Sequence, residues 1–243
     1  LDGPKDKDDW KTAPDKLPEA AREYLEKWKE SFDLFDKEKP FLQISDLKSK
    51  KLTPISKLDF FLATGNNTTM FDHAANGKEK RNIDVRNIPV MLLTFQCFSP
   101  GGGLPITSWD KIKTGQVGNP DALCVTGGMY HTFLRRHNLL ETISLNLLPK
   151  TTVKSHYGMI NKDDYWGKPV WENWPRKPDD KKAKNNATQT YLGRLTPICR
   201  WVKIDPDLSG IDCGRGFDYP IMNRKIKKPK KGQPNLPVWP AEP

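Results

Sequence analysis

The sequence predicts an α+β fold, an irregular mixture of helices and strands joined by long loops. Segments with apolar residues at helical spacing alternate with short apolar runs typical of strands, and no βαβ rhythm repeats. The 243 residues suffice for one large domain or two small ones. Hydrophobic residues make up only 36%, but 8 Trp, 10 Phe and 6 Tyr provide aromatic anchors for a core.

The N-terminal part predicts a helix, a strand and a second helix. Apolar residues recur at helical spacing over 19–35, which predicts a helix with one packed face: Ala21, Tyr24, Leu25, Trp28, Phe32 and Phe35. The Lys39-Pro40 step ends this helix, and residues 41–44 have the pattern of a short strand. A short helix is predicted over 53–62, with Thr53 as N-cap and Pro54 at the first helical position.

The middle of the chain predicts a long polar loop over 65–87, followed by a buried strand over 90–95. The glycine-rich residues 99–103 then break the chain sharply, and a second loop reaches Gly128. Residues 130–134 have an extended pattern.

A helix is predicted over 139–148, because Asn138 and Glu141 have the spacing of a capping box. Its apolar residues share one face: Leu139, Leu140, Ile143 and Leu147. A strand is predicted over 196–204, before a glycine-rich, basic tail.

The positive charge is concentrated near the C-terminal end. With 40 Lys+Arg against 30 Asp+Glu, the formal net charge is +10. Residues 222–231 contain six basic side chains and no acidic one, a density that suits binding to a phosphate backbone. The alternative is a solvated loop that only maintains solubility. A second basic cluster, 176–184, is diluted by Asp179 and Asp180 and is interpreted as a surface loop.

Several classes of function lack support in the sequence. No apolar run approaches the roughly 20 residues of a membrane span. The three glycines 101–103 are not followed by Lys-Ser/Thr, and no G-x-G-x-x-G opens a helix, so nucleotide-binding fingerprints are missing. No nucleophile motif is present either. The sequence therefore predicts neither an enzyme nor a cofactor.

Metal ligands are also not indicated. The four cysteines are far apart without a C-x-x-C pair, which favours reduced thiols over a zinc site or a disulfide framework: Cys97, Cys124, Cys199 and Cys213. The four histidines lack ligand spacing and are interpreted as structural: His73, His131, His137 and His156.

An ordered series of motifs resembles a known family. The series is FDLFDKEKPF with Leu42-Gln43 after it, LTPISKL, Thr69-Met70-Phe71, Ser99-Pro100 with three glycines, TFLRRHNLLETISLNLLP and VWPAEP. In this order, the motifs resemble the large subunit (CasA family) of Cascade, the type I-E CRISPR surveillance complex. The resemblance spans nearly the whole chain.

The resemblance implies that residues 1–243 are part of one N-terminal α+β domain. The first strands of that domain and the C-terminal four-helix bundle would lie outside this chain. It implies a non-catalytic cytoplasmic subunit that recognises the protospacer-adjacent motif (PAM) in target double-stranded DNA, helps open the duplex and recruits the helicase-nuclease. The implied partners are the guide RNA, other Cascade subunits, the target DNA and the helicase-nuclease. Binding to a membrane is not implied.

Two groups of site residues follow from the resemblance. Gly101, Gly102 and Gly103 correspond to the glycine loop that approaches the PAM in the minor groove, and Lys225, or Lys227 in a shifted register, to the lysine that enters it. A polar loop that anchors the subunit near the guide RNA corresponds to Phe71, Asp72, His73, Asn76, Lys78 and Arg81. Some family members carry cysteine pairs suited to zinc, but the four cysteines do not reproduce them, so no metal is predicted.

A function of another class remains open. The chain would then be a basic globular interaction protein that binds RNA or an acidic partner without reading its sequence.

Overall fold

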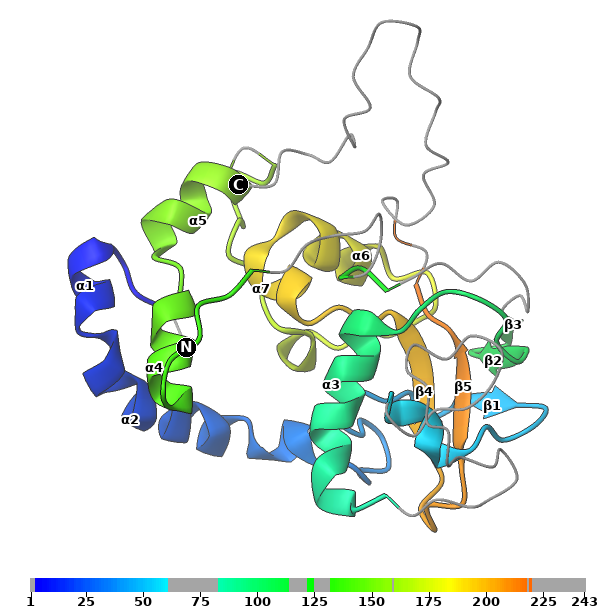
Figure 1. Ribbon diagram of the computed structural model, residues 1–243. Helices are drawn as coiled ribbons and strands as arrows, with labels where there is room; N and C mark the ends of the chain where they lie inside the picture. The colour runs from blue at the N-terminus through cyan, green and yellow to red at the C-terminus, as the bar shows by residue number, and fades with distance from the viewer. Residues whose placement is uncertain are drawn as a thin grey trace, which may run out of the picture.

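The computed structural model describes residues 3–60, 83–113, 122–124, 132–158, 160–217 and 219, and it confirms the α+β prediction (Figure 1). The helices in this part are α1 (Lys7–Lys11), α2 (Ala13–Lys27), α3 (Ile88–Phe98), α4 (Leu139–Asn146), α5 (Lys150–Tyr157), α6 (Lys181–Gln189) and α7 (Tyr191–Leu195). The strands are β1 (Lys48–Ser49), β2 (Thr107–Trp109), β3 (Ile112–Lys113), β4 (Arg200–Ile204) and β5 (Ile211–Arg215). None of these helices is long and apolar enough to cross a membrane.

The centre of the fold is the antiparallel hairpin β4–β5, whose register runs from Arg200↔Arg215 to Ile204↔Ile211. Strands β1, β2 and β3 form a smaller antiparallel sheet in that order. This sheet packs against β5, where a Cβ added at Gly214 would lie 2.0 Å from Thr107 Oγ1. Glycine at position 214 therefore allows β2 to pass close to β5.

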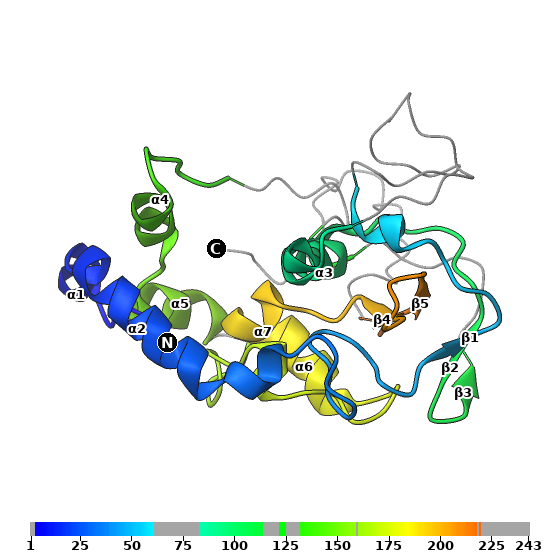
Figure 2. The same cartoon turned by 90° about the horizontal axis from the view of Figure 1, so that it is seen from below.

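The edge of β4 that faces away from β5 is covered rather than exposed. In both views α3 lies next to β4 on this side (Figures 1 and 2). Further along the strand, the Ile44 N–H donates to the Val202 carbonyl (2.9 Å), and the Ile204 N–H donates to Gln43 Oε1 (2.7 Å). These bonds satisfy backbone groups that an open edge strand would offer to another chain.

The core surrounds the hairpin and is rich in aromatic rings. Trp201 on β4 contacts Trp109 edge to face, with 5.3 Å between ring centroids, and Phe217 at 6.4 Å. Leu47 and Leu92 are completely buried beside them. The aromatic anchors expected from the composition thus form the core.

Helices α1, α2, α4 and α5 lie together at one side of the molecule, away from the hairpin (Figures 1 and 2). Tyr24 joins α2 to the rest, because its hydroxyl donates to Glu172 (2.5 Å) and accepts from Trp171 Nε1 (2.8 Å). Burial, followed by the hydrogen bond to Glu172, raises the pKa of Tyr24.

The helix predicted over 19–35 exists but is shifted toward the N-terminus. Helix α2 begins at Ala13, with Pro14 in its first turn, and ends at Lys27, before a separate 3₁₀ turn at Lys29–Phe32. Leu25 and Phe35, which were assigned to the packed face, are exposed. Pro14 fits the first turn of the helix, and Pro18 lies inside it.

Two predicted strands are wrong. Residues 41–44 are buried but not a strand, because Leu42 has a φ of +54° and a Gln43 side chain replaces the backbone as acceptor from β4. Residues 90–95 belong to α3, which begins with Pro89 in its first turn and continues to Phe98. A short run that is apolar on all sides does not distinguish a buried strand from a buried helix.

The other predictions had mixed outcomes. Helix α4 is confirmed, since the Glu141 N–H donates to Asn138 Oδ1 at 2.8 Å. Its predicted apolar face is largely exposed, with Leu139 at 74%. Strand β4 confirms the second half of 196–204. The helix predicted over 53–62 is only a 3₁₀ turn at Ile55–Leu58 in its described part, and Thr53 pairs with Ile211 instead of capping it.

Candidate nucleic-acid interface

The three glycines 101–103, called the glycine loop below, are the part of the predicted DNA site that the structure describes. Helix α3 leads directly to them. It ends where the Ser99 N–H donates to the Phe95 carbonyl (3.1 Å), and Ser99 itself is extended with a ψ of 129°. Pro100 follows, and the residue before a proline is biased away from the helical conformation. The chain therefore leaves α3 sharply at the start of the glycine loop.

Gly102 has a conformation that requires glycine. Its φ is +130°, where a Cβ atom would be strained. Gly101 and Gly102 are half-buried and Gly103 is exposed. Gly102 takes part in a β-bridge, so backbone without a side chain is exposed at Gly103, which permits a close approach by another molecule.

The entrance of the glycine loop is held by Arg200, a β4 residue that is 1% exposed. Its Nη2 donates to the carbonyls of Ser99 (3.3 Å) and Pro100 (2.9 Å), and Nη1 donates to the Cys199 carbonyl (2.6 Å). These bonds reach the residue immediately before Gly101. The guanidinium connects the loop to the central hairpin.

The strand that follows the glycine loop packs against the next residue of β4. The chain enters β2, where Thr107 and Trp109 are buried. The Trp109 ring contacts Trp201 edge to face. The entrance of the loop is therefore bonded to Arg200, and the strand that begins four residues after Gly103 packs against the next residue, Trp201.

Residues 122–124 pair with the C-terminal end of α3 and with Ser99, which follows it. The Ala122 N–H donates to the Ser99 carbonyl (2.9 Å), and the Cys124 N–H donates to the Cys97 carbonyl (3.3 Å). The Leu123 N–H donates to Cys199 Sγ at 3.4 Å. Three cysteines thus meet behind the glycine loop.

Two of the thiols in this region have raised pKa values. Contact with Cys124 and burial raise the pKa of Cys97, and burial raises the pKa of Cys199 to about 12. No cysteine forms a disulfide, and the described residues contain no group of three His, Cys, Asp or Glu arranged to hold a metal ion. A thiol with a raised pKa is a poor nucleophile, because the thiolate is the reactive form.

Tyr219, the last described residue before the basic run, is held close to β4. The Tyr219 hydroxyl donates to the Ile198 carbonyl (3.0 Å), and Phe217 packs against Trp201. Tyr219 is 1% exposed, and burial raises its pKa.

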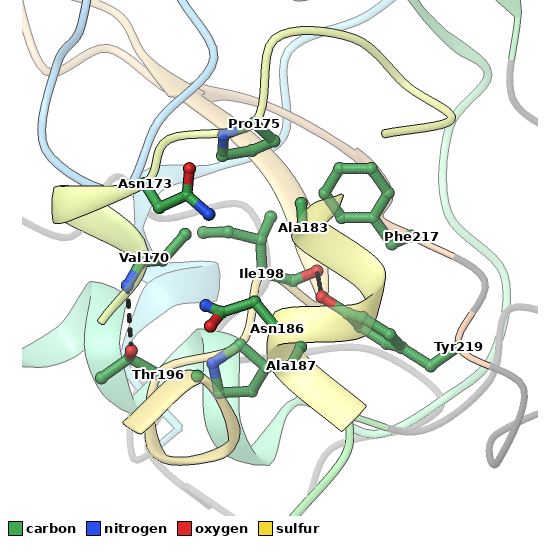
Figure 3. Close-up of a pocket in the computed structure, with 12 residues that line it drawn as sticks. Val170, Asn173, Pro175, Ala183, Asn186, Ala187, Thr196, Ile198, Phe217 and Tyr219 are labelled. Carbon is green, nitrogen blue, oxygen red and sulfur yellow. Dashed lines mark hydrogen bonds between the residues drawn. The ribbon is translucent and has the colours of Figure 1, made fainter. Parts of the chain in front are cut away.

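A cavity beside Tyr219 is shown in Figure 3, between the Ile198 segment and the side chains of Asn173 and Asn186. Its volume is about 10 Å³, which is room for a single water molecule. The Val170 N–H donates to Thr196 Oγ1 (3.2 Å) at its edge. This cavity is too small for a substrate or a nucleobase and belongs to the packing around Tyr219.

The other predicted site residues lie outside the described residues. These are Lys225 and Lys227 of the basic run, and Phe71, Asp72, His73, Asn76, Lys78 and Arg81 of the polar loop. Whether the glycine loop and Lys225 share one face therefore stays a prediction.

Sequence reasoning did not find Arg200 and Gln96 as residues that support the glycine loop. The only local signal is an amide side chain within the apolar run of α3 and a cation at the start of an apolar strand. Buried polar side chains in such positions need partners, which is a weak indication of a structural hydrogen-bond network.

The fold and the site define an α+β structure in which a glycine loop follows α3 and is hydrogen-bonded at its entrance to the central hairpin. The chain belongs to the family described as CRISPR-associated protein Cse1, whose family model matches residues 1–234. This membership confirms the resemblance found in the motifs.

Individual relatives agree with this assignment. The CRISPR-associated protein CasA/Cse1 of Thermus thermophilus is 34% identical over 198 residues, which cover 82% of this chain and 35% of that protein. The crystal structure of Thermobifida fusca Cse1 has a TM-score of 0.57 at 21% identity and covers 88% of this chain and 41% of that one. Cse1 from Acidimicrobium ferrooxidans also has a TM-score of 0.57, at 18% identity, with 90% and 40% covered. The chain thus spans about two fifths of the length of these solved relatives.

Proposed function

We propose that residues 1–243 are part of the N-terminal domain of the large subunit of Cascade. This subunit is non-catalytic and cytoplasmic. It recognises the PAM in target double-stranded DNA, aids duplex opening and recruits the helicase-nuclease. The guide RNA and the other Cascade subunits are its partners. In such a complex, base pairing with the guide supplies most of the sequence specificity, and the protein reads only a short motif.

The observation that carries the proposal is the glycine loop itself. The minor groove of B-DNA is about 6 Å wide, so only a slim backbone element enters it closely. Gly102 has a φ of +130° and Gly103 is exposed, at a turn anchored by a buried arginine. A preorganised turn loses little conformational entropy when it binds.

Chain length supports a role for the basic run at the same site. Tyr219 is fixed against Ile198, two residues before Arg200, which bonds to the entrance of the glycine loop. Lys225 follows six residues after Tyr219. Six residues span at most about 20 Å when extended, so the lysine is tethered within reach of this part of the domain.

In this proposal Lys225, or Lys227, contributes a point charge at the groove. A lysine reaches the acceptors of A·T edges but reads a degenerate code, which suits tolerance of several PAMs. The polar loop that contains Phe71 and Arg81 anchors the subunit near the guide RNA.

The proposal is tested by target binding of the full complex, assembled with this subunit, to duplexes that differ only in the PAM, at two salt concentrations. We expect PAM-dependent affinity that is lost with Lys225→Ala and with Gly102→Val. Lys182→Ala, an exposed lysine on α6, is the matched control and should retain it. Binding that ignores the PAM and falls only with salt would support the alternative, a basic interaction protein without sequence readout.

A further inference from the structure

Arg200 is the only arginine among the most completely buried side chains of the described residues. Burying a guanidinium is costly unless its N–H groups are satisfied. Here the acceptors are backbone carbonyls, two of which belong to Ser99 and Pro100 at the entrance of the glycine loop. The cost of burial is therefore offset at one specific place, the junction between α3 and the loop.

The chemistry of these acceptors explains why a side chain is needed. Pro100 has no N–H, so it cannot take part in a regular ladder as a donor. Pro100 can still accept a hydrogen bond through its carbonyl, and Arg200 Nη2 donates to that carbonyl at 2.9 Å. The same nitrogen donates to the Ser99 carbonyl, which also accepts from the Ala122 N–H.

The arginine is itself held rigidly. Its backbone N–H donates to Gln96 Oε1 (2.8 Å), and its carbonyl accepts from Gln96 Nε2 (2.8 Å). On the other side, Arg200 is opposite Arg215 in the β4–β5 register. A planar guanidinium on a fixed strand defines both the distance and the direction of its donors.

We propose that Arg200 is a positioning residue that holds the glycine loop in the conformation in which it approaches the minor groove. This inference rests on the proposed function of the loop. Arg200 does not touch DNA in this role. It acts through the carbonyls of Ser99 and Pro100, and the neighbouring Trp201 packs against Trp109 of β2, the strand that follows the loop.

A lysine at position 200 retains the positive charge but lacks the planar guanidinium with its fixed set of donors. Its ammonium is a compact point charge on a flexible stem, so it does not hold the two carbonyls in the same geometry. Arg200→Lys therefore separates the positioning role from the electrostatic attraction of a cation for DNA. The matched control is Arg22→Lys on α2, whose side chain is 74% exposed.

The test uses the full complex and measures the ratio of the dissociation constants for a duplex without and with the PAM. We expect Arg200→Lys to lower this ratio about tenfold, with guide-RNA content and binding to PAM-free DNA unchanged, and Arg22→Lys to leave it unchanged. An unaltered ratio in Arg200→Lys overturns the inference. Equal losses of affinity for both duplexes also overturn it, because a purely electrostatic or structural role predicts that result.

A second variant decides the question even if Arg200→Lys prevents assembly. Pro100→Gly removes the stiffness of the chain at the loop but keeps the carbonyl that accepts from Arg200. If the arginine positions the loop, Pro100→Gly retains at least about half of the ratio of the dissociation constants without and with the PAM. If it loses the ratio in an assembled complex, chain stiffness at Pro100 positions the loop and the inference is wrong.

The proposed function has its own readout in the same assay. If the unaltered complex shows no PAM ratio, or if Gly102→Val leaves the ratio unchanged, the proposed function of the loop fails. If Gly102→Val lowers the ratio while Arg200→Lys does not, only the role of Arg200 fails.

Discussion

The side-chain amide of Gln96 on α3 bonds to Arg200 on β4 as a neighbouring strand would. It donates to the Arg200 carbonyl and accepts from the Arg200 N–H, both at 2.8 Å. The Cys199 N–H also donates to Gln96 Oε1 (2.9 Å). One buried side chain thus satisfies three backbone groups, two of Arg200 at the start of β4 and one of Cys199 just before it, and connects the helix before the glycine loop to the strand that anchors it.

Gln96→Leu should therefore destabilise the chain strongly. Leucine has a similar volume but leaves these three buried backbone groups without their partner, and each such group costs about 1–3 kcal/mol. We expect the free energy of unfolding in urea to fall by about 3–5 kcal/mol. Gln189→Leu, at a half-buried position of α6, is the control and should change it by less than about 1 kcal/mol. A small effect at Gln96 would contradict the role assigned to its amide.

Trp28→Ala should cost less than the deletion of a fully buried tryptophan. Trp28 is half-buried at the end of α2, where it contacts Tyr24 with 6.5 Å between ring centroids. The burial of about half a side chain corresponds to roughly 1–2 kcal/mol, against about 3–5 kcal/mol for complete burial. Thermal unfolding measures the difference. An unchanged melting temperature would show that the ring does not pack against the domain.

The features that could be predicted from the sequence are local. The Asn138 cap of α4 depends on residues three positions apart, and the turn at Gly102 follows from three consecutive glycines. The bonds from Gln96 and Arg200 to their acceptors join residues about one hundred positions apart, for which no local pattern exists. The run 90–95 was assigned to a strand because it has no polar face that would show the helical period.

Stability should decrease in alkaline solution because thiols with raised pKa values are held in the folded chain; besides Cys97, these are the fully buried Cys199 and Cys213. Burial raises the pKa of Cys199 to about 12 and that of Cys213 to about 11, from 9.0. Above pH 9 the thiols of the unfolded chain lose protons first, so a rising pH favours unfolding until the folded thiols ionise as well. We expect a loss of about 1.4 kcal/mol per pH unit for each thiol in this range.

Urea unfolding between pH 8.5 and 9.5 measures this loss, in a range where most tyrosines of the unfolded chain, with a pKa of about 10, keep their proton. Cys213→Ala removes one of these thiols and should reduce the slope of stability against pH. A slope that is the same with and without Cys213 would show that its thiol ionises equally in the folded and unfolded states.

Lys225→Ala and Phe71→Ala should have different effects, because the proposal assigns Lys225 to the target DNA and Phe71 to anchoring of the subunit near the guide RNA. Removing the lysine charge should weaken target binding by the assembled complex about tenfold or more, with little effect on assembly on the guide RNA. Removing the phenyl ring should loosen retention of the subunit in the complex, since aromatic anchors dominate the energy of interfaces. Size-exclusion chromatography measures retention, and titration with labelled duplex measures binding. Equal loss of both activities in both variants would indicate misfolding and would contradict the division of roles.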